Sequence, residues 1–212
     1  MVYGGSYQVY GAGVCPNCGV AHAPAFQIKE SQRSRFKLMQ FMAEMSTILT
    51  ATPSIGPSRP PLVHAGAGQR FMLGILISGA STLVAASGNN HTRHDFERVA
   101  QMKGYTTCPP RKAMEGFNVS AVGRRIPTGQ YMATQRAGAS PPGSCAAPRL
   151  IQKAFSIPAI AVNRQHWEMS EVFYQPNTER RTRNDPYWVH GLSAHHCATC
   201  DNLVPLLMCP VS

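Results

Sequence analysis

The sequence predicts an α/β fold, because segments with helical periodicity alternate with short apolar segments typical of strands. Residues 30–49 carry apolar side chains near helical spacing, and residues 146–155 repeat that pattern on one face. Residues 81–87 and 169–174 are apolar runs of the length expected for buried strands. With 212 residues, 43% of them hydrophobic, the chain can form a core in one compact domain that carries an extension.

Other segments complete the expected order of elements. They are a helix at 69–77, a short amphipathic helix at 93–102, a possible strand pair at 118–122 and 130–134, and a final helix starting near Cys197. A linker rich in Pro, Gly and Ser lies at 52–61. We therefore divide the chain into an N-terminal extension, residues 1–65, and a main domain, residues 66–212.

The charge of the chain indicates a polyanionic partner. Twenty Lys and Arg residues face ten Asp and Glu residues, which gives a net charge of +10. The basic residues form four clusters: Arg33/Arg35/Lys37, Arg111/Lys112, Arg124/Arg125 and Arg180/Arg181/Arg183. Such clusters could line a groove for nucleic acid, although a soluble basic protein without this function is the alternative. The chain has no apolar run long enough to span a membrane and no secretory signal at its start.

The cysteines favour metal binding over disulfides. Their number is odd, and they include two C-x-x-C pairs: the positions are Cys15, Cys18, Cys108, Cys145, Cys197, Cys200 and Cys209. A disulfide framework of a secreted protein would need an even number. Metal ligation is therefore the interpretation that we pursue.

Three of these cysteines are expected to form an open metal site. Ser144 is a suitable N-cap and Pro148 suits a first helical turn, so Cys145 lies at a helix N-terminus, where the dipole favours a thiolate. Cys197 and Cys200 are three residues apart at the start of another helix and point to the same side. Three thiolates leave the fourth position of a zinc ion open to water, which is typical of a catalytic site.

These segments resemble the signature of the cytidine deaminase-like superfamily, in which a His or Cys followed by Ala-Glu is combined with a later C-x-x-C. The C-A-x-P-R context at 145–149 is similar, more narrowly, to deaminase domains of polymorphic toxins and their fungal relatives. The resemblance covers about residues 81–209. It implies a three-layer fold whose mixed sheet carries the zinc-binding helices on one face, with Cys145, Cys197 and Cys200 as the zinc ligands.

Two departures from the family accompany the resemblance. The family glutamate, which carries protons between water and the base, falls at position 147, where this chain has Ala. We interpret Ala147 as an engineered replacement, because an active DNA mutator is toxic to its host; a naturally inactive relative is the alternative. Two strands that many members have after the C-x-x-C do not fit behind Cys200, so either they are missing or upstream strands complete the sheet.

Four residues are expected near the substrate. Ser87 and Asn89 end the strand that borders the pocket in the family, although Gly88 and its neighbours also suit an ordinary turn. His196 could touch the base or only cap the helix that follows it. Trp167 could stack on a base or serve in packing.

A second, structural metal site is possible around Cys15 and Cys18. His22 lies close in sequence, and Cys108 could complete the ligand set. Reduced thiols in a surface turn are the alternative. Cys209 is expected to be a buried apolar residue rather than a ligand.

The resemblance and the charge together predict zinc-dependent deamination of cytosine to uracil in single- or double-stranded DNA. The alternatives are an RNA or tRNA deaminase, a free-nucleoside deaminase, and a zinc-stabilised nucleic-acid-binding protein without activity. We expect a monomer. The sequence leaves open whether the protein acts in the cytoplasm or nucleus, or in a target cell as a toxin domain.

Overall fold

The computed structural model describes residues 7–51, 71–90, 93–109, 143–175 and 198–211, together with Gly191 and Ser193. The elements follow in the order β1 (Val9–Tyr10), η1 (Pro24–Phe26), β2 (Ile28–Lys29), α1 (Gln32–Ala51), β3 (Phe71–Ser78), β4 (Ser81–Ala86), α2 (His94–Met102), β5 (Thr106–Thr107), α4 (Ala146–Phe155), α5 (Pro158–Ala161), η4 (Arg164–His166), β6 (Glu168–Tyr174) and α6 (Ala198–Leu207).

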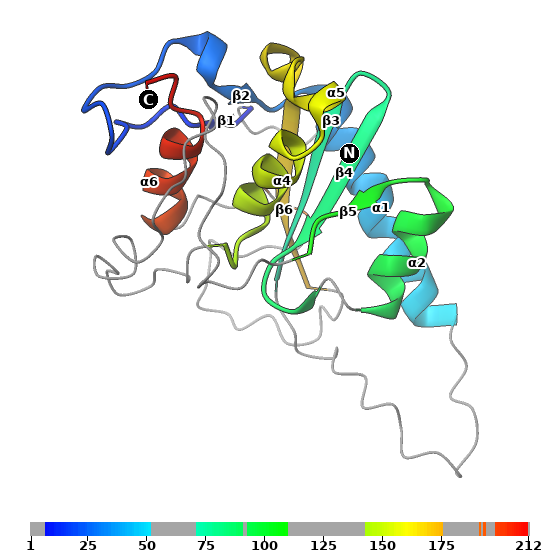
Figure 1. The fold of residues 1–212 in the computed structure, drawn as a ribbon. Coiled ribbons are helices and arrows are strands. Elements are labelled where there is room, and N and C mark those ends of the chain that lie inside the picture. The colour runs from blue at the N-terminus through cyan, green and yellow to red at the C-terminus, as the bar shows by residue number, and fades with distance from the viewer. Residues whose placement is uncertain are drawn as a thin grey trace.

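The strands form one mixed sheet of six strands in the order β1-β2-β6-β3-β4-β5 (Figure 1). Strands β3 and β4 form an antiparallel hairpin whose turn contains Gly79 at a φ of +58°, a conformation that glycine adopts without strain. Strand β6 runs antiparallel to β3 on its other side. The short strands β2 and β5 pair in parallel with β6 and β4. The predicted α/β class with a mixed sheet is confirmed.

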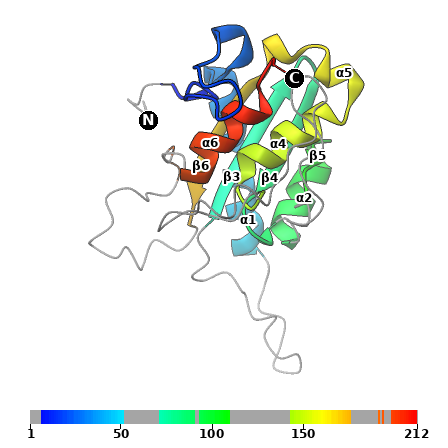
Figure 2. The same ribbon diagram turned by 60° about the vertical axis from the view of Figure 1, so that its left-hand side comes forward.

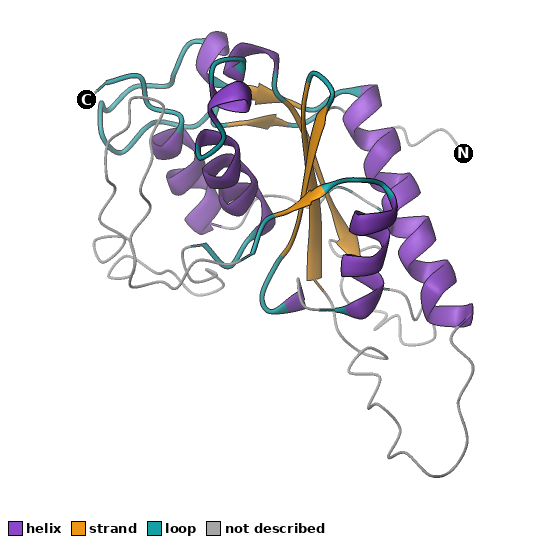
Figure 3. Cartoon of the chain, turned by 45° about the vertical axis from the view of Figure 1, so that its right-hand side comes forward, coloured by secondary structure: helices purple, strands orange, loops and turns teal. Residues whose placement is uncertain are grey.

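Helices cover both faces of this sheet. Helices α4 and α6 lie together on one face, and α1 and α2 lie on the other (Figure 2). Figure 3 shows the sheet between the two helical layers. Side chains alternate along β6, so that Met169 belongs to the buried cluster under α4 and α6 and Val172 to the cluster under α1 and α2. The central strands are therefore buried on both faces.

Most predicted elements agree with the structure. Helix α4 has the predicted bounds, and α1, α2, β4 and β6 lie within two residues of theirs. The predicted helix at 69–77 is wrong, because residues 71–78 form the central strand β3. This strand is apolar almost without interruption, since both of its faces are covered, and such a run has no period that distinguishes strand from helix. The predicted strands at 118–122 and 130–134 lie outside the described residues.

The N-terminal extension, residues 1–65, contributes strands to the common sheet. Strands β1 and β2 continue it beyond β6, and α1 packs on β6 and β3. A buried carboxylate, that of Glu30, fastens this edge: it accepts hydrogen bonds from the Gln8 N–H at 3.0 Å, from the Ser170 hydroxyl, and from the Arg35 guanidinium at 2.6 Å. A buried charge is stable only with such partners. Upstream strands thus occupy the sheet edge beside β6.

Gly74 in β3 allows α4 to approach the sheet closely. A Cβ atom at this position would lie 2.9 Å from Leu150 Cδ1 and 3.0 Å from Ala146 Cβ, both on α4. The substitution Gly74→Ala should therefore push α4 away and lower the free energy of unfolding by about 1–3 kcal/mol. Chemical denaturation measures this change. The control is Ser81→Ala at the exposed start of β4, which should change stability little; equal stability of the two variants would contradict the close packing.

Candidate functional site

The N-terminus of α4 is the first part of the candidate site. Cys145, which is half-buried, is itself the N-cap residue, with extended backbone angles of φ −79° and ψ 159°. The expectation that Ser144 caps the helix is wrong. The carbonyl of Ser144 instead accepts a hydrogen bond at 2.9 Å from the N–H of Gly88, in the turn after β4. The turn at the end of β4 therefore lies beside the residue that precedes Cys145.

Arg149 reinforces this connection from inside the protein. Its side chain is only 5% exposed, and its guanidinium donates to the carbonyls of Gly143, at 2.8 Å, and Ala86. Burial lowers the pKa of Arg149 to about 10, while the neighbouring Cys145 opposes that shift. Arg149 thus ties the loop before Cys145 to the end of β4 and brings a positive charge close to that thiol.

Ala147 lies at the second position of α4 and is fully buried. Its N–H donates to Glu171 Oε1 at 2.8 Å, and Glu171 lies opposite Gly74 in the sheet with 5% exposure. An anionic carboxylate at a helix N-terminus is favourable because it pairs with free N–H groups and the helix dipole. Sequence reasoning missed Glu171, although an acidic residue in the middle of a buried strand was a usable signal.

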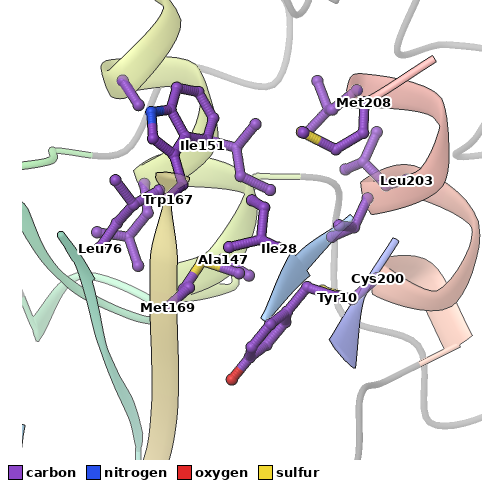
Figure 4. Packing of buried hydrophobic residues seen from close by; sticks show 14 of the residues in the cluster. Tyr10, Ile28, Leu76, Ala147, Ile151, Trp167, Met169, Cys200, Leu203 and Met208 are labelled. Atoms are coloured by element: carbon purple, nitrogen blue, oxygen red, sulfur yellow. The ribbon is translucent and has the colours of Figure 1, made fainter. Parts of the chain in front are cut away.

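Helix α6 supplies the second part of the site. Cys200 lies in its first turn with 3% exposure, and α6 packs against α4. Figure 4 shows Ala147 on α4 and Cys200 on α6 in the same buried cluster, with Tyr10 and Ile28 of the N-terminal strands nearby. Cys197 and His196 lie outside the described residues. The structure thus brings two of the three predicted ligand cysteines onto neighbouring helices of one face.

The expected substrate residues differ in their surroundings. Ser87 accepts a hydrogen bond from the N–H of Met72 at 2.9 Å, and Asn89 is exposed in the following turn. Trp167 is 3% exposed, and its indole N–H donates to the carbonyl of Ile160 at 3.0 Å. Such burial leaves little of the ring open to a base, so packing, the second of the two expected roles of Trp167, agrees better with the structure.

A second group of metal-binding side chains lies near both ends of the chain. Cys15, Cys18, His22 and Cys209 each direct one donor atom into a common volume, and these atoms all lie within 4.8 Å of one another. The group could hold a metal ion. Cys209 is buried, as expected from the sequence, but its sulfur also lies among these donor atoms, because the chain beyond α6 returns to the N-terminal loop.

Cys108 does not belong to this group, which corrects the expectation that it would complete the ligand set. It is buried after β5, where its N–H bonds to the carbonyl of Val84. Burial raises the pKa of its thiol to about 12, an effect that the charges of Lys153 and Arg149 only partly offset. Cys108 is therefore a protonated core residue near α4.

Burial shifts the pKa of two members of the four-residue group. Burial raises the pKa of the Cys15 thiol to about 11, so a metal ion would have to displace its proton. Burial also lowers the pKa of His22, which favours the neutral imidazole that binds metals. Its Nε2 atom lies 3.4 Å from the Cys18 sulfur, and its buried Nδ1 atom has no hydrogen-bond partner within the described part of the chain.

The first basic cluster, Arg33/Arg35/Lys37, lies on α1 within the described residues. Arg33 pairs with Glu168 at 3.2 Å, Arg35 pairs with the buried Glu30, and the Lys37 ammonium donates to the Thr82 hydroxyl at 3.3 Å. These contacts attach α1 to the sheet, on the face opposite α4 and α6. That this cluster lines a groove for nucleic acid stays a prediction, and the other three clusters lie outside the described residues.

Among the described residues, no helix combines the length and the apolar character needed to cross a bilayer. Comparison of the chain with models of known protein families, with curated proteins and with solved structures found no significant match.

Proposed function

We propose that the protein is a zinc-dependent cytosine deaminase that acts on DNA, in a form that lacks the catalytic glutamate. One observation carries the proposal. Cys145 caps α4 and Cys200 lies in the first turn of α6, on two helices that pack together on one face of a mixed sheet. This is the arrangement that the resemblance to the cytidine deaminase-like superfamily implies. The three-layer organisation and the N-terminal strands at the sheet edge also agree with it.

The donor set suits zinc. The side chains of Cys145, Cys197 and Cys200 would hold the ion, and three thiolates leave one position open. When bound, zinc lowers the pKa of a coordinated water and so supplies a hydroxide at neutral pH. Arg149 contributes to the site from the interior of the protein, since its positive charge lies near Cys145 and favours the thiolate form of that side chain.

Position 147 determines whether the reaction proceeds. Deamination needs a group that accepts a proton from water and delivers protons to the ring nitrogen and to the departing ammonia. The methyl group of Ala147 can do neither. Glu171 is occupied in binding the N–H of residue 147, so it orients the start of α4. Position 147 lies one residue too early in α4 for a capping box, since Cys145 is the N-cap.

The substrate class follows from charge and from the turn after β4. A net charge of +10 favours a polyanion over a free nucleoside. The turn at Ser87–Asn89 adjoins Ser144 and therefore the N-terminus of α4, where a sugar or phosphate could approach. RNA, tRNA and a free nucleoside are the alternative substrates for a deaminase.

A second candidate function is a nucleic-acid-binding protein stabilised by zinc, without catalysis. The observation that favours it is the burial of Ala147, which is 0% exposed within the apolar cluster. In this case alanine would be the residue that the fold requires at position 147.

The substitution Ala147→Glu separates the two functions. Zinc-loaded Ala147→Glu protein should convert cytosine to uracil in DNA, with a rate at least about 10⁴-fold above that of the Ala147 protein, because one carboxylate serves several proton transfers. Sequencing a randomised pool of single- and double-stranded DNA after incubation measures both the activity and the sequence preference.

The control for this experiment is Ala147→Gln, which has nearly the same shape as glutamate but cannot carry a proton. It should remain inactive. If folded, zinc-loaded Ala147→Glu protein leaves cytosine unchanged in DNA, in RNA and as free cytidine, the deaminase function is wrong, and the binding function takes its place.

Binding of nucleic acid should depend strongly on salt. Each neutralised phosphate releases counterions, so four phosphate contacts alone would lower the affinity about 100-fold between about 50 and about 200 mM salt. The triple substitution Arg180→Gln, Arg181→Gln and Arg183→Gln should reduce this slope, measured by fluorescence anisotropy. The matched control is Arg33→Gln, since Arg33 is engaged with Glu168. A flat salt response would favour the free-nucleoside alternative.

A further inference from the structure

We propose that Cys15, Cys18, His22 and Cys209 bind one zinc ion in a closed, four-ligand site that joins the N-terminal loop to the segment after α6. This structural site shares no ligand with the open site proposed above, and it does not depend on deaminase activity. Cys209 is nearly two hundred residues away from the other three ligands in the sequence, yet the donor atoms of all four side chains lie within 4.8 Å of one another.

The geometry of the group suits a tetrahedral ion. A zinc ion with Zn–S bonds of about 2.3 Å and a Zn–N bond of about 2.0 Å holds its ligand atoms about 3.5–3.8 Å apart. The Cys18 sulfur and His22 Nε2 are already 3.4 Å apart. The remaining donor atoms are at most 4.8 Å apart, so their separations need to shorten by only about an ångström to reach these values. Three soft sulfur ligands with one imidazole favour zinc over magnesium or calcium, which prefer oxygen.

The backbone around Cys15 and Cys18 is shaped for metal binding. The N–H of Gly19 donates to the carbonyl of Cys15 at 2.9 Å, the N–H of Cys15 donates to the carbonyl of Val20 at 3.0 Å, and Gly19 has a φ of +72°. These bonds close a tight turn that brings both thiols to one side. The N–H of Asn17 points at the Cys15 sulfur at 3.4 Å, and such a donor stabilises a thiolate ligand.

The fourth ligand arrives from the far end of the sequence and is also oriented. The Asn17 side-chain amide donates to the Cys209 sulfur at 3.4 Å and to the carbonyl of Val211 at 3.2 Å. The C-terminal segment lies beside the N-terminal loop in both ribbon views (Figures 1 and 2). One residue, Asn17, therefore positions two of the four ligands, as residues that hydrogen-bond to metal ligands commonly do.

A disulfide is a weaker explanation of the same cluster. Three cysteines can form only one disulfide, which would leave one thiol and His22 facing it. Cys15, Cys18 and Cys209 are not joined by a disulfide in the structure. A zinc ion, in contrast, uses all four side chains, and its two positive charges offset most of the charge of the three thiolates.

Zinc at this site would fix the position of α6. Cys209 follows the end of α6 by two residues, and the loop before Cys15 contacts the same helix: a Cβ atom at Gly11 would lie 3.7 Å from Val204 and Met208. Because Cys200 lies in the first turn of α6, the metal at the four-residue site would also hold a ligand of the open site in place. Loss of this metal should therefore lower the temperature of unfolding.

Zinc content of the full chain tests the proposal. The double variant Cys197→Ser/Cys200→Ser removes the open site, so it should retain one zinc per chain by elemental analysis. In that background, Cys209→Ser should lose this zinc, whereas Cys108→Ser should keep it, since Cys108 is an equally buried cysteine outside the cluster. Retention of a full zinc equivalent after Cys209→Ser, or a disulfide between any two of the three cluster cysteines, would overturn the site.

X-ray absorption at the zinc edge tests the same ligand set if the Cys209→Ser variant does not fold, because it needs no substitution in the four-residue site. In the Cys197→Ser/Cys200→Ser protein it should show three sulfur neighbours at about 2.3 Å and one nitrogen at about 2.0 Å. A shell with oxygen or with four sulfurs would reject the ligand set. If zinc-loaded Ala147→Glu protein is inactive while the Cys197→Ser/Cys200→Ser protein gives this spectrum, the deaminase function alone is rejected, so the two proposals fail separately.

Discussion

The close contact between α4 and the sheet is the constraint on which the candidate site depends. Gly74 provides the space, since no other residue would let Ala146 and Leu150 lie so near β3. Glu171 lies opposite Gly74 in the sheet and uses its carboxylate to bind the N–H of Ala147. Because Gly74 in β3 has no side chain, the charged side chain of Glu171 in the neighbouring strand β6 has room. Together these two residues determine how close to the sheet α4 begins, after its N-cap residue Cys145.

The sequence was informative where one physical rule dominated. Helix α4 was predicted with its observed bounds because its apolar residues lie on one face and Pro148 suits the first turn. Strand β3 was mistaken for a helix because burial on both faces removes the alternation by which strands are recognised. The Cys15/Cys18 pair was found from its spacing, whereas its partner Cys209 could not be, because spacing does not reveal which distant residues meet.

Electrostatic roles were the hardest to predict. Arg35 and Glu30 were expected on a surface and inside a helix, respectively, yet they form a partly buried ion pair that anchors the N-terminal strands. Arg149 was noted only as part of a motif, although its burial beside two backbone carbonyls makes it a structural support of the site. Composition gives the number of charges, but only the fold decides which of them must satisfy an internal partner and which remain for a ligand.

The parallel pairing of β2 with β6 joins Lys29 to Glu168 across most of the chain. During synthesis the edge of β2 therefore stays unpaired until β6 has been made. A contact between residues so far apart in the sequence also forms slowly. Until then, an unpaired strand edge and the apolar face of α1 are open to association with other chains. The topology consequently makes the growing polypeptide, rather than the finished fold, the stage most exposed to aggregation and most dependent on chaperones.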